Sequence, residues 1–132
     1  MELTYSKTVT IVGTVATFIF GKWDVPLKII VCLTVLDFLS GIMKAVYTNT
    51  ISSRVGYKGI VRKAGILTVI IVANLLDLLT GVFLFRTAII FFFASTESIS
   101  LIENIGAMDV PIPRFLKEKL IQLRDSNNEI KK

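Results

Sequence analysis

The feature that most constrains this chain is an almost unbroken apolar stretch over residues 64–108. Its charged side chains are Asp77, Arg86, Glu97 and Glu103. As a single helix rising about 1.5 Å per residue, the stretch would be roughly twice as long as the hydrocarbon core of a bilayer is thick. We therefore expect it to cross the membrane twice, as spans over residues 64–85 and 87–108. The turn is expected within residues 80–87, where Gly81 weakens the helix.

The overall composition agrees with a membrane location. Hydrophobic residues make up 53% of the 132 residues, and the mean hydropathy is +0.71. Charged residues account for 19%, whereas soluble domains usually contain about a quarter. We therefore expect an all-α integral membrane protein with three to four transmembrane helices, in which residues 1–132 form a single membrane domain.

Two further apolar segments precede this hairpin. Residues 25–47 are long enough for a full span, and Pro26 suits the first turn of a helix. Residues 6–23 form a shorter apolar segment, about 27 Å long as a helix. This length fits a crossing of a thin membrane region, and a helix lying in the membrane plane is the alternative. We expect that residues 6–23 cross the membrane.

Polar side chains recur inside the expected spans. Asp37, Ser40 and Lys44 follow helical spacing and share one face of residues 25–47. A charged group at the centre of a membrane helix costs about 2.5–3.5 kcal/mol to insert, so such a face must point at protein or water. The candidate lumen-lining or inter-helix polar residues are Asp37, Ser40, Lys44, Asn74, Asp77, Glu97, Ser100, Glu103 and Asn104. Two roles stay open for them, packing between subunits or lining of a water-filled passage.

Depth along the helices suggests how these residues are arranged. By helical rise, Asp37, Asp77 and Glu97 fall in one layer near the bilayer centre. Burial and like charge both disfavour ionised carboxylates. We therefore hypothesise that several of these acids are protonated and hydrogen-bonded between helices in a closed state. Opening of a water-filled passage would then hydrate and ionise them. Lys44 and Glu103 also have similar depths, which predicts an ion pair within or between subunits.

The basic residues predict the topology. The connection over residues 48–63 contains no acidic residue, and its basic residues are Arg54, Lys58, Arg62 and Lys63. Because Lys and Arg accumulate on the cytoplasmic side of membrane proteins, we place this connection and the C-terminus inside. Residues 113–125 are expected to form an amphipathic cytoplasmic helix with Leu116, Leu120 and Leu123 on its apolar face. The net charge of +5 is explained by this topology, and we expect no nucleic-acid binding.

The sequence lacks the usual elements of an active site. It contains no histidine, no Gly-rich phosphate loop and no cysteine cluster. We therefore expect no enzymatic activity, no cofactor and no bound metal.

Three segments carry a family resemblance. They are LDFLSG at residues 36–41, GYKGIVRK at 56–63, and ESISLIEN at 97–104 followed by VPIP at 110–113. Over about residues 25–125 the chain resembles the phage-lysis and toxin-secretion holin family, which includes the clostridial holin linked to toxin release. The resemblance implies a small phage or prophage protein that accumulates in the bacterial cytoplasmic membrane, oligomerises and opens lesions at a set time. Its partners would be copies of itself, membrane lipid and, functionally, a peptidoglycan hydrolase (endolysin) that leaves through the lesions.

Self-association also follows from the residues themselves, because three or four short helices with polar faces cannot enclose a passage for a folded protein within one copy. The alternative function is a small four-helix transporter or ion channel that works as a dimer and uses a membrane carboxylate. Such proteins typically place their key acid in the first span, and this chain has none between Glu2 and Asp24. A non-conducting membrane adaptor is a further alternative.

Overall fold

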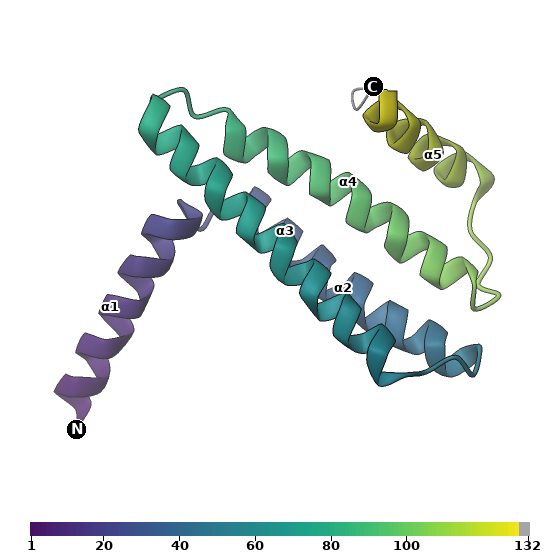
Figure 1. The fold of residues 1–132 in the computed structure, drawn as a ribbon, viewed down its shortest axis with the longest axis horizontal. Helices are drawn as coiled ribbons and strands as arrows, with labels where there is room; N and C mark the ends of the chain where they lie inside the picture. Colours follow the sequence, from purple (N-terminus) through teal and green to yellow (C-terminus); the bar gives the residue numbers. More distant parts are fainter. Residues whose placement is uncertain (130–132) are drawn as a thin grey trace.

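A computed structural model describes residues 1–129 as five helices joined by short connections (Figure 1). The helices are α1 (Glu2–Phe20), α2 (Val25–Tyr47), α3 (Ser53–Thr80), α4 (Phe85–Gly106) and α5 (Arg114–Glu129). The first four are each long and apolar enough to cross a membrane. The expected all-α fold with up to four transmembrane helices is therefore confirmed.

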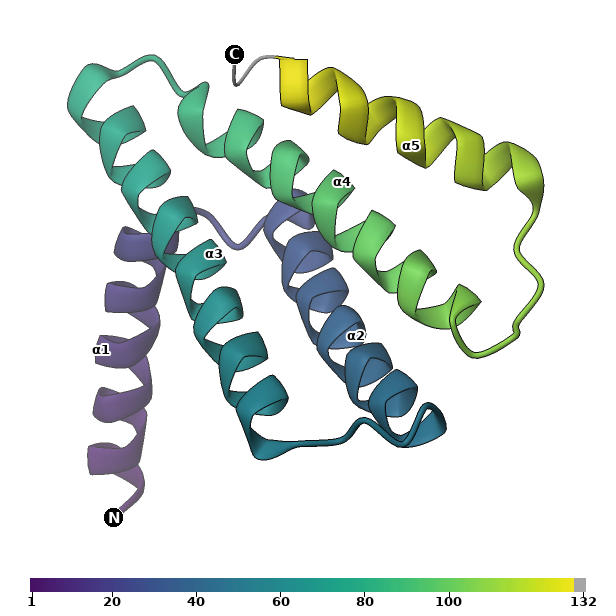
Figure 2. The same ribbon diagram turned by 45° about the vertical axis from the view of Figure 1, so that its right-hand side comes forward.

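Helices α2, α3 and α4 form the central unit, with α2 and α4 as its most extensively packed pair (Figure 2). Its apolar core consists of buried aliphatic side chains, one group from each helix: Leu27 and Ile30 of α2, Ile66 and Ile70 of α3, and Ile90 of α4. In lipid such contacts stabilise by close packing, because the surrounding acyl chains are as apolar as the side chains themselves. The polar contacts described below must therefore set much of the register between these helices.

The starts of α2 and α3 are fixed by side chains that cap them. Asp24 Oδ1 accepts a hydrogen bond from the Leu27 N–H at 3.2 Å, and Pro26 lies in the first turn of α2. Ser52 Oγ accepts one from the Val55 N–H at 3.3 Å and caps α3 in the same way. Helix α3 therefore starts within residues 48–63, which the sequence suggested were a polar connection.

The bounds of α3 correct the expected span over residues 64–85. The helix begins at Ser53, ends at Thr80 and is 28 residues long, so only residues 48–52 connect it to α2. Gly81 follows the last helical residue, and its φ of +70° gives the left-handed geometry common just after helix ends. At about 1.5 Å per residue α3 measures about 42 Å, which exceeds the ~30 Å hydrocarbon core. Because the first turns of α3 carry Arg54 and Lys58, we expect the excess length at that end.

Helix α1 stands apart from the central unit and is held at its C-terminal end (Figures 1 and 2). None of its residues is buried, and it packs against α3. Asn74 Nδ2 donates to the carbonyls of Phe18 and Ile19, and Arg86 Nε donates to the carbonyl of Phe20. These are carbonyls that the last turn of a helix leaves without intrahelical partners.

Helix α5 lies beside α4 (Figures 1 and 2). A cavity between the two helices is lined by residues that include Ile99, Glu103 and Lys117. It begins at Arg114 and extends to Glu129, beyond the expected 113–125. The side chains of Leu120 and Leu123 lie outside those that the structure describes. The apolar face expected for this helix therefore stays a prediction.

We predict that Gly21→Ala disrupts the attachment of α1. Gly21 has a φ of +79°, and a Cβ there lies 2.4 Å from Asn74 Oδ1 and 2.9 Å from Arg86 Nε. Backbone strain of this kind costs about 1–3 kcal/mol, and the clash adds to it. Thermal unfolding in detergent, followed by the fluorescence of Trp23, should show an earlier transition. Gly13→Ala is the control because its Cβ meets nothing within 4 Å, and equal behaviour of the two variants would contradict the prediction.

Candidate functional site

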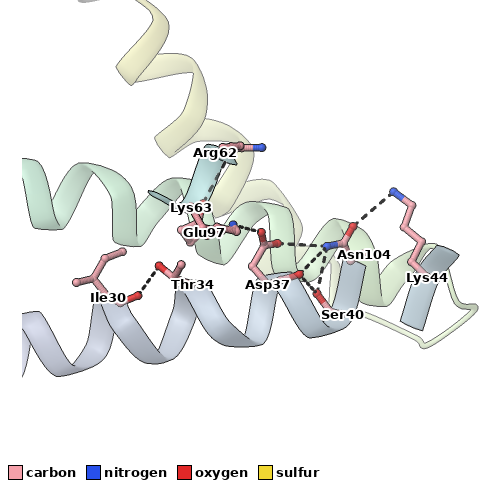
Figure 3. A network of polar contacts seen from close by, with 9 residues as sticks. All are labelled: Ile30, Thr34, Asp37, Ser40, Lys44, Arg62, Lys63, Glu97 and Asn104. Carbon is pink, nitrogen blue, oxygen red and sulfur yellow. Dashed lines mark hydrogen bonds and ion pairs between the residues drawn. The ribbon is translucent and has the colours of Figure 1, made fainter. Parts of the chain in front are cut away.

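A largely buried lysine, Lys63, joins α2, α3 and α4 (Figure 3). Lys63 Nζ on α3 forms ion pairs with Asp37 Oδ2 on α2 and Glu97 Oε2 on α4. The Lys63 side chain is 13% exposed, that of Asp37 is 7% and that of Glu97 is fully buried. Each helix of the central unit thus contributes one charge to the same point.

Asn104 extends this cluster toward the α2–α3 connection. Its Nδ2 donates to Asp37 Oδ1 at 3.2 Å and to Ser40 Oγ at 3.1 Å, while Ser40 Oγ donates to the Asp37 carbonyl at 2.9 Å. Lys44 Nζ donates to Asn104 Oδ1 at 3.4 Å. Together with Lys63 and Glu97, these residues form what we call the central cluster, namely Asp37, Ser40, Lys44, Lys63, Glu97 and Asn104.

A second cation lies at the edge of the central cluster. Arg62 Nη2 is 4.0 Å from Glu97 Oε1, and the Arg62 side chain is 57% exposed. Glu97 Oε1 is buried and accepts no hydrogen bond from the described residues. Asp37 and Glu97 therefore face Lys63 and Arg62, and the four formal charges balance. These cations offset the like-charge repulsion between Asp37 and Glu97, and the hypothesis that several acids are protonated until a passage opens stays a prediction.

We expected Asp37, Asp77 and Glu97 to lie in one layer near the bilayer centre, but Asp77 lies at the end of α3. Its Oδ1 accepts from the N–H groups of Leu84 and Phe85 at 2.9 and 2.8 Å, and its Oδ2 accepts from the Arg86 N–H at 3.0 Å. Asp77 thus caps the start of α4. The depth estimate failed because it counted from residue 64, whereas α3 ends at Thr80 and Asp77 lies in its last turn.

Arg86 is the centre of a second polar cluster, at the opposite end of the bundle. Its Nη1 and Nη2 bind the two Asp24 carboxylate oxygens at 2.9 and 3.0 Å, and Nη2 also donates to the Lys22 carbonyl at 2.7 Å. The hydrogen-bonded guanidinium holds the pKa of the Asp24 carboxyl below its ordinary value. We call Asp24, Asn74, Asp77 and Arg86 the terminal cluster. The Arg86 side chain is 10% exposed.

The remaining candidate residues lie outside both clusters. Ser100 is partly buried, and no hydrogen bond to a described residue joins it to the central cluster. Glu103 is exposed and lines the cavity beside α5, and Lys44 Nζ donates to Asn104 Oδ1. A Lys44–Glu103 ion pair, within or between subunits, stays a prediction. The side chains of Arg54 and Lys58 are exposed.

The arrangement of the polar side chains is suited to holding helices together. Within residues 1–129, no group of three or more His, Cys, Asp or Glu side chains is placed to hold a metal ion. The central cluster joins α2, α3 and α4 through ion pairs and hydrogen bonds.

Comparison with known proteins identifies related sequences. The sequence model of the bacteriophage holin family matches residues 14–125. An uncharacterised protein of Clostridium perfringens is 42% identical over 122 residues, covering 91% of this chain and 90% of that protein. A protein of Bacillus phage phi105 named "Probable holin" is 30% identical over 115 residues, covering 85% of this chain and 83% of its own length. No solved structure matches the chain.

We predict a pH dependence from the Asp24–Arg86 pair. The folded-state pKa of Asp24 is lowered, so the pair stabilises the protein at pH values above the ordinary carboxyl pKa of about 4, and this contribution disappears as the pH falls through the lowered value. The parent should therefore unfold at a higher temperature than Asp24→Asn at pH 7, with the gap closing in acid. Unfolding in detergent between pH 7 and pH 3 measures this. A gap that is constant over this range would contradict the assignment.

Proposed function

Since this chain belongs to the bacteriophage holin family, we propose that it oligomerises in the bacterial cytoplasmic membrane and opens lesions through which a cell-wall hydrolase leaves the cell during lysis. The observation that carries the proposal is the family match over residues 14–125, which includes α2, α3, α4 and most of α5. Family membership supports a holin role in lysis and a membrane protein with several spans. Release of a toxin in place of a hydrolase is a variant of the same proposal.

The distribution of polar and apolar groups supports oligomerisation. Asp37, Lys63 and Glu97 of the central cluster are paired with one another. Large side chains on the outside of the bundle are apolar, for example Val35 and Leu39 of α2, Val72 of α3 and Phe91 of α4. Within a single copy, the polar groups contact one another, and the exposed apolar side chains are free to contact lipid or other copies. A lesion wide enough for a folded enzyme therefore requires many copies and a change in how the polar groups are paired.

We propose that opening separates the central cluster. Lys63 would exchange its contacts with Asp37 and Glu97 for water as these residues come to line a lumen. Water stabilises separated charges, whereas a dry bundle requires them to be paired, so hydration supplies the free energy for this exchange. Asp77 has a different task in this scheme, since it caps α4 in the terminal cluster.

For the orientation, we propose that the basic end of α3 and the C-terminus are cytoplasmic. The α2–α3 connection and the first turns of α3 carry Arg54, Lys58 and Arg62 without a neighbouring acid in residues 48–63. This bias favours retention on the cytoplasmic side. With four crossings, the N-terminus lies on the same side.

We predict that induced expression in a bacterium abolishes the membrane potential abruptly and releases a large cytoplasmic reporter enzyme. With a wall hydrolase present, the cells should lyse. Potential-sensitive dye fluorescence and reporter activity in the medium measure the two effects. Selective ion or substrate flux without release of the reporter would indicate the alternative transporter or channel, and an unchanged potential at high membrane levels would indicate an adaptor.

We also predict that Lys63→Met opens the membrane earlier than the parent. Removing one partner of a buried pair costs about 3–5 kcal/mol, and this cost falls on the closed bundle because water compensates Asp37 and Glu97 once a lumen forms. Lys58→Met is the control, since Lys58 is exposed and should keep the parent's schedule. The time of reporter release is measured at matched membrane levels.

A variant that removes all three charges of Asp37, Lys63 and Glu97 tests the same mechanism. In the triple variant Asp37→Asn, Lys63→Met, Glu97→Gln no buried charge is left unpaired, so the closed bundle should persist and opening should be delayed. If the single and the triple variant both release the reporter on the parent's schedule, separation of the central cluster is not part of opening.

A further inference from the structure

A cavity of about 440 Å³ lies between the later turns of α2, the short connection after it and the first turns of α3. Its volume falls in the range of about 300–1,000 Å³ that is common for ligand sites. Much of its wall is apolar, with Phe38, Ile42, Ile51 and Val55 among the lining residues, and Gly56 leaves it open where a side chain would otherwise stand. The cavity is therefore shaped to hold an apolar group.

The polar floor of this cavity carries no net charge. Asp37, Lys63 and Asn104 line it, and they are paired with one another in the central cluster. Arg62 also lines the cavity, and its side chain is 57% exposed. The accessible charge at the cavity is therefore positive.

Arg62 continues a row of cations along α3. Arg54, Lys58 and Arg62 are spaced four residues apart and thus lie along one ridge of the helix. Arg54 and Lys58 make no hydrogen bond or ion pair with another residue in the part of the chain that the structure describes. Residues 48–63 contain no acid, and the ion pair of the ridge is the one between Arg62 Nη2 and Glu97 Oε1 at 4.0 Å. Arg54, Lys58 and the exposed part of the Arg62 guanidinium therefore offer positive charge to a partner outside this chain.

The depth of the ridge identifies the kind of partner. Because α3 is longer than the hydrocarbon core and carries its cations in its first turns, we place those turns among the lipid headgroups, where phosphates are abundant. Arg62 lies about 12 Å deeper than Arg54 by helical rise. An exposed guanidinium at that depth is costly unless it reaches the headgroups or an anion reaches it. An anion tethered to an apolar chain meets both the charge of the ridge and the apolar wall of the cavity.

We propose that this cavity binds one anionic phospholipid, with its phosphate on Arg62 and Lys58 and one acyl chain against the apolar wall. Arg binds phosphate through two parallel hydrogen bonds, and each basic side chain near a membrane surface strengthens attraction to anionic lipid. A zwitterionic lipid with the same chains fits the cavity but gains less from the ridge. The site is independent of the proposed lytic function.

Binding to the purified full chain in detergent tests this proposal. Native mass spectrometry compares phosphatidylglycerol with phosphatidylcholine of identical acyl chains. The parent should bind one phosphatidylglycerol about tenfold or more tightly than phosphatidylcholine, and Arg62→Gln should weaken this about fivefold. Lys119→Gln is the charge control, since Lys119 lies on α5 away from the cavity, and it should change binding less than about twofold.

Filling the cavity gives a test that leaves every charge in place. Gly56→Phe should weaken binding of both lipids, whereas Gly65→Phe should not, because Gly65 is exposed on the same helix and does not line the cavity. If Gly56→Phe fails to fold by circular dichroism, Gly56→Leu replaces it. A phosphatidylglycerol with a photoactivatable acyl chain should label the parent on the peptides around Ile42 and Val55.

Three results would overturn the proposal. The first is equal binding of the two lipids, which indicates unspecific annular lipid. The second is equal binding by the Gly56 and Gly65 variants, or photolabelling spread evenly along the apolar surface. The third is a change in cross-linked oligomers, without a change in lipid binding, when Gly56 is replaced, which assigns the cavity to a second copy of the chain.

Discussion

The central unit depends on one ammonium group held between two carboxylates away from water. Lys63 binds Asp37 and Glu97, and each of the three comes from a different helix. In lipid, apolar contacts alone discriminate weakly between helix registers, because side chain and solvent have similar polarity. A misplaced register would leave a buried charge unpaired, at a cost of several kcal/mol. The ion pairs therefore select the register of α2, α3 and α4, and the aliphatic core then fills the space between them.

The terminal cluster fixes the other end of the bundle by a different means. Arg86 binds the Asp24 carboxylate and main-chain carbonyls, and Asp77 binds main-chain N–H groups at the start of α4. Most of these bonds satisfy helix ends, which otherwise leave several backbone groups without partners. Hydrogen bonding at chain turns thus determines where α1 ends and α4 begins, while charge pairing determines how the middles of the helices are aligned.

The sequence predicted the helices well and their polar contacts only in part. Apolar length gave the all-α membrane fold, and helical spacing placed Asp37, Ser40 and Lys44 on one face, where they all reach the central cluster. The partner of Asp37 was missed because Lys63 was assigned to a polar connection. The Ser52 cap and the absence of proline from residues 53–63 were signals that α3 begins earlier. Depth counted from the wrong helix start also misplaced Asp77.

The two clusters differ in how readily water can replace their bonds, and this difference bears on opening. The bonds of the terminal cluster close helix ends, so breaking them unravels turns as well as separating charges. The pairs of Lys63 with Asp37 and Glu97 join the sides of intact helices, so they can separate while every helix keeps its own hydrogen bonds. In the opening that we propose, a transition that keeps the helices and changes their neighbours therefore separates the central cluster first. The hydrogen bonds of Asn74 and Arg86 to the end of α1 would keep α1 attached during this transition.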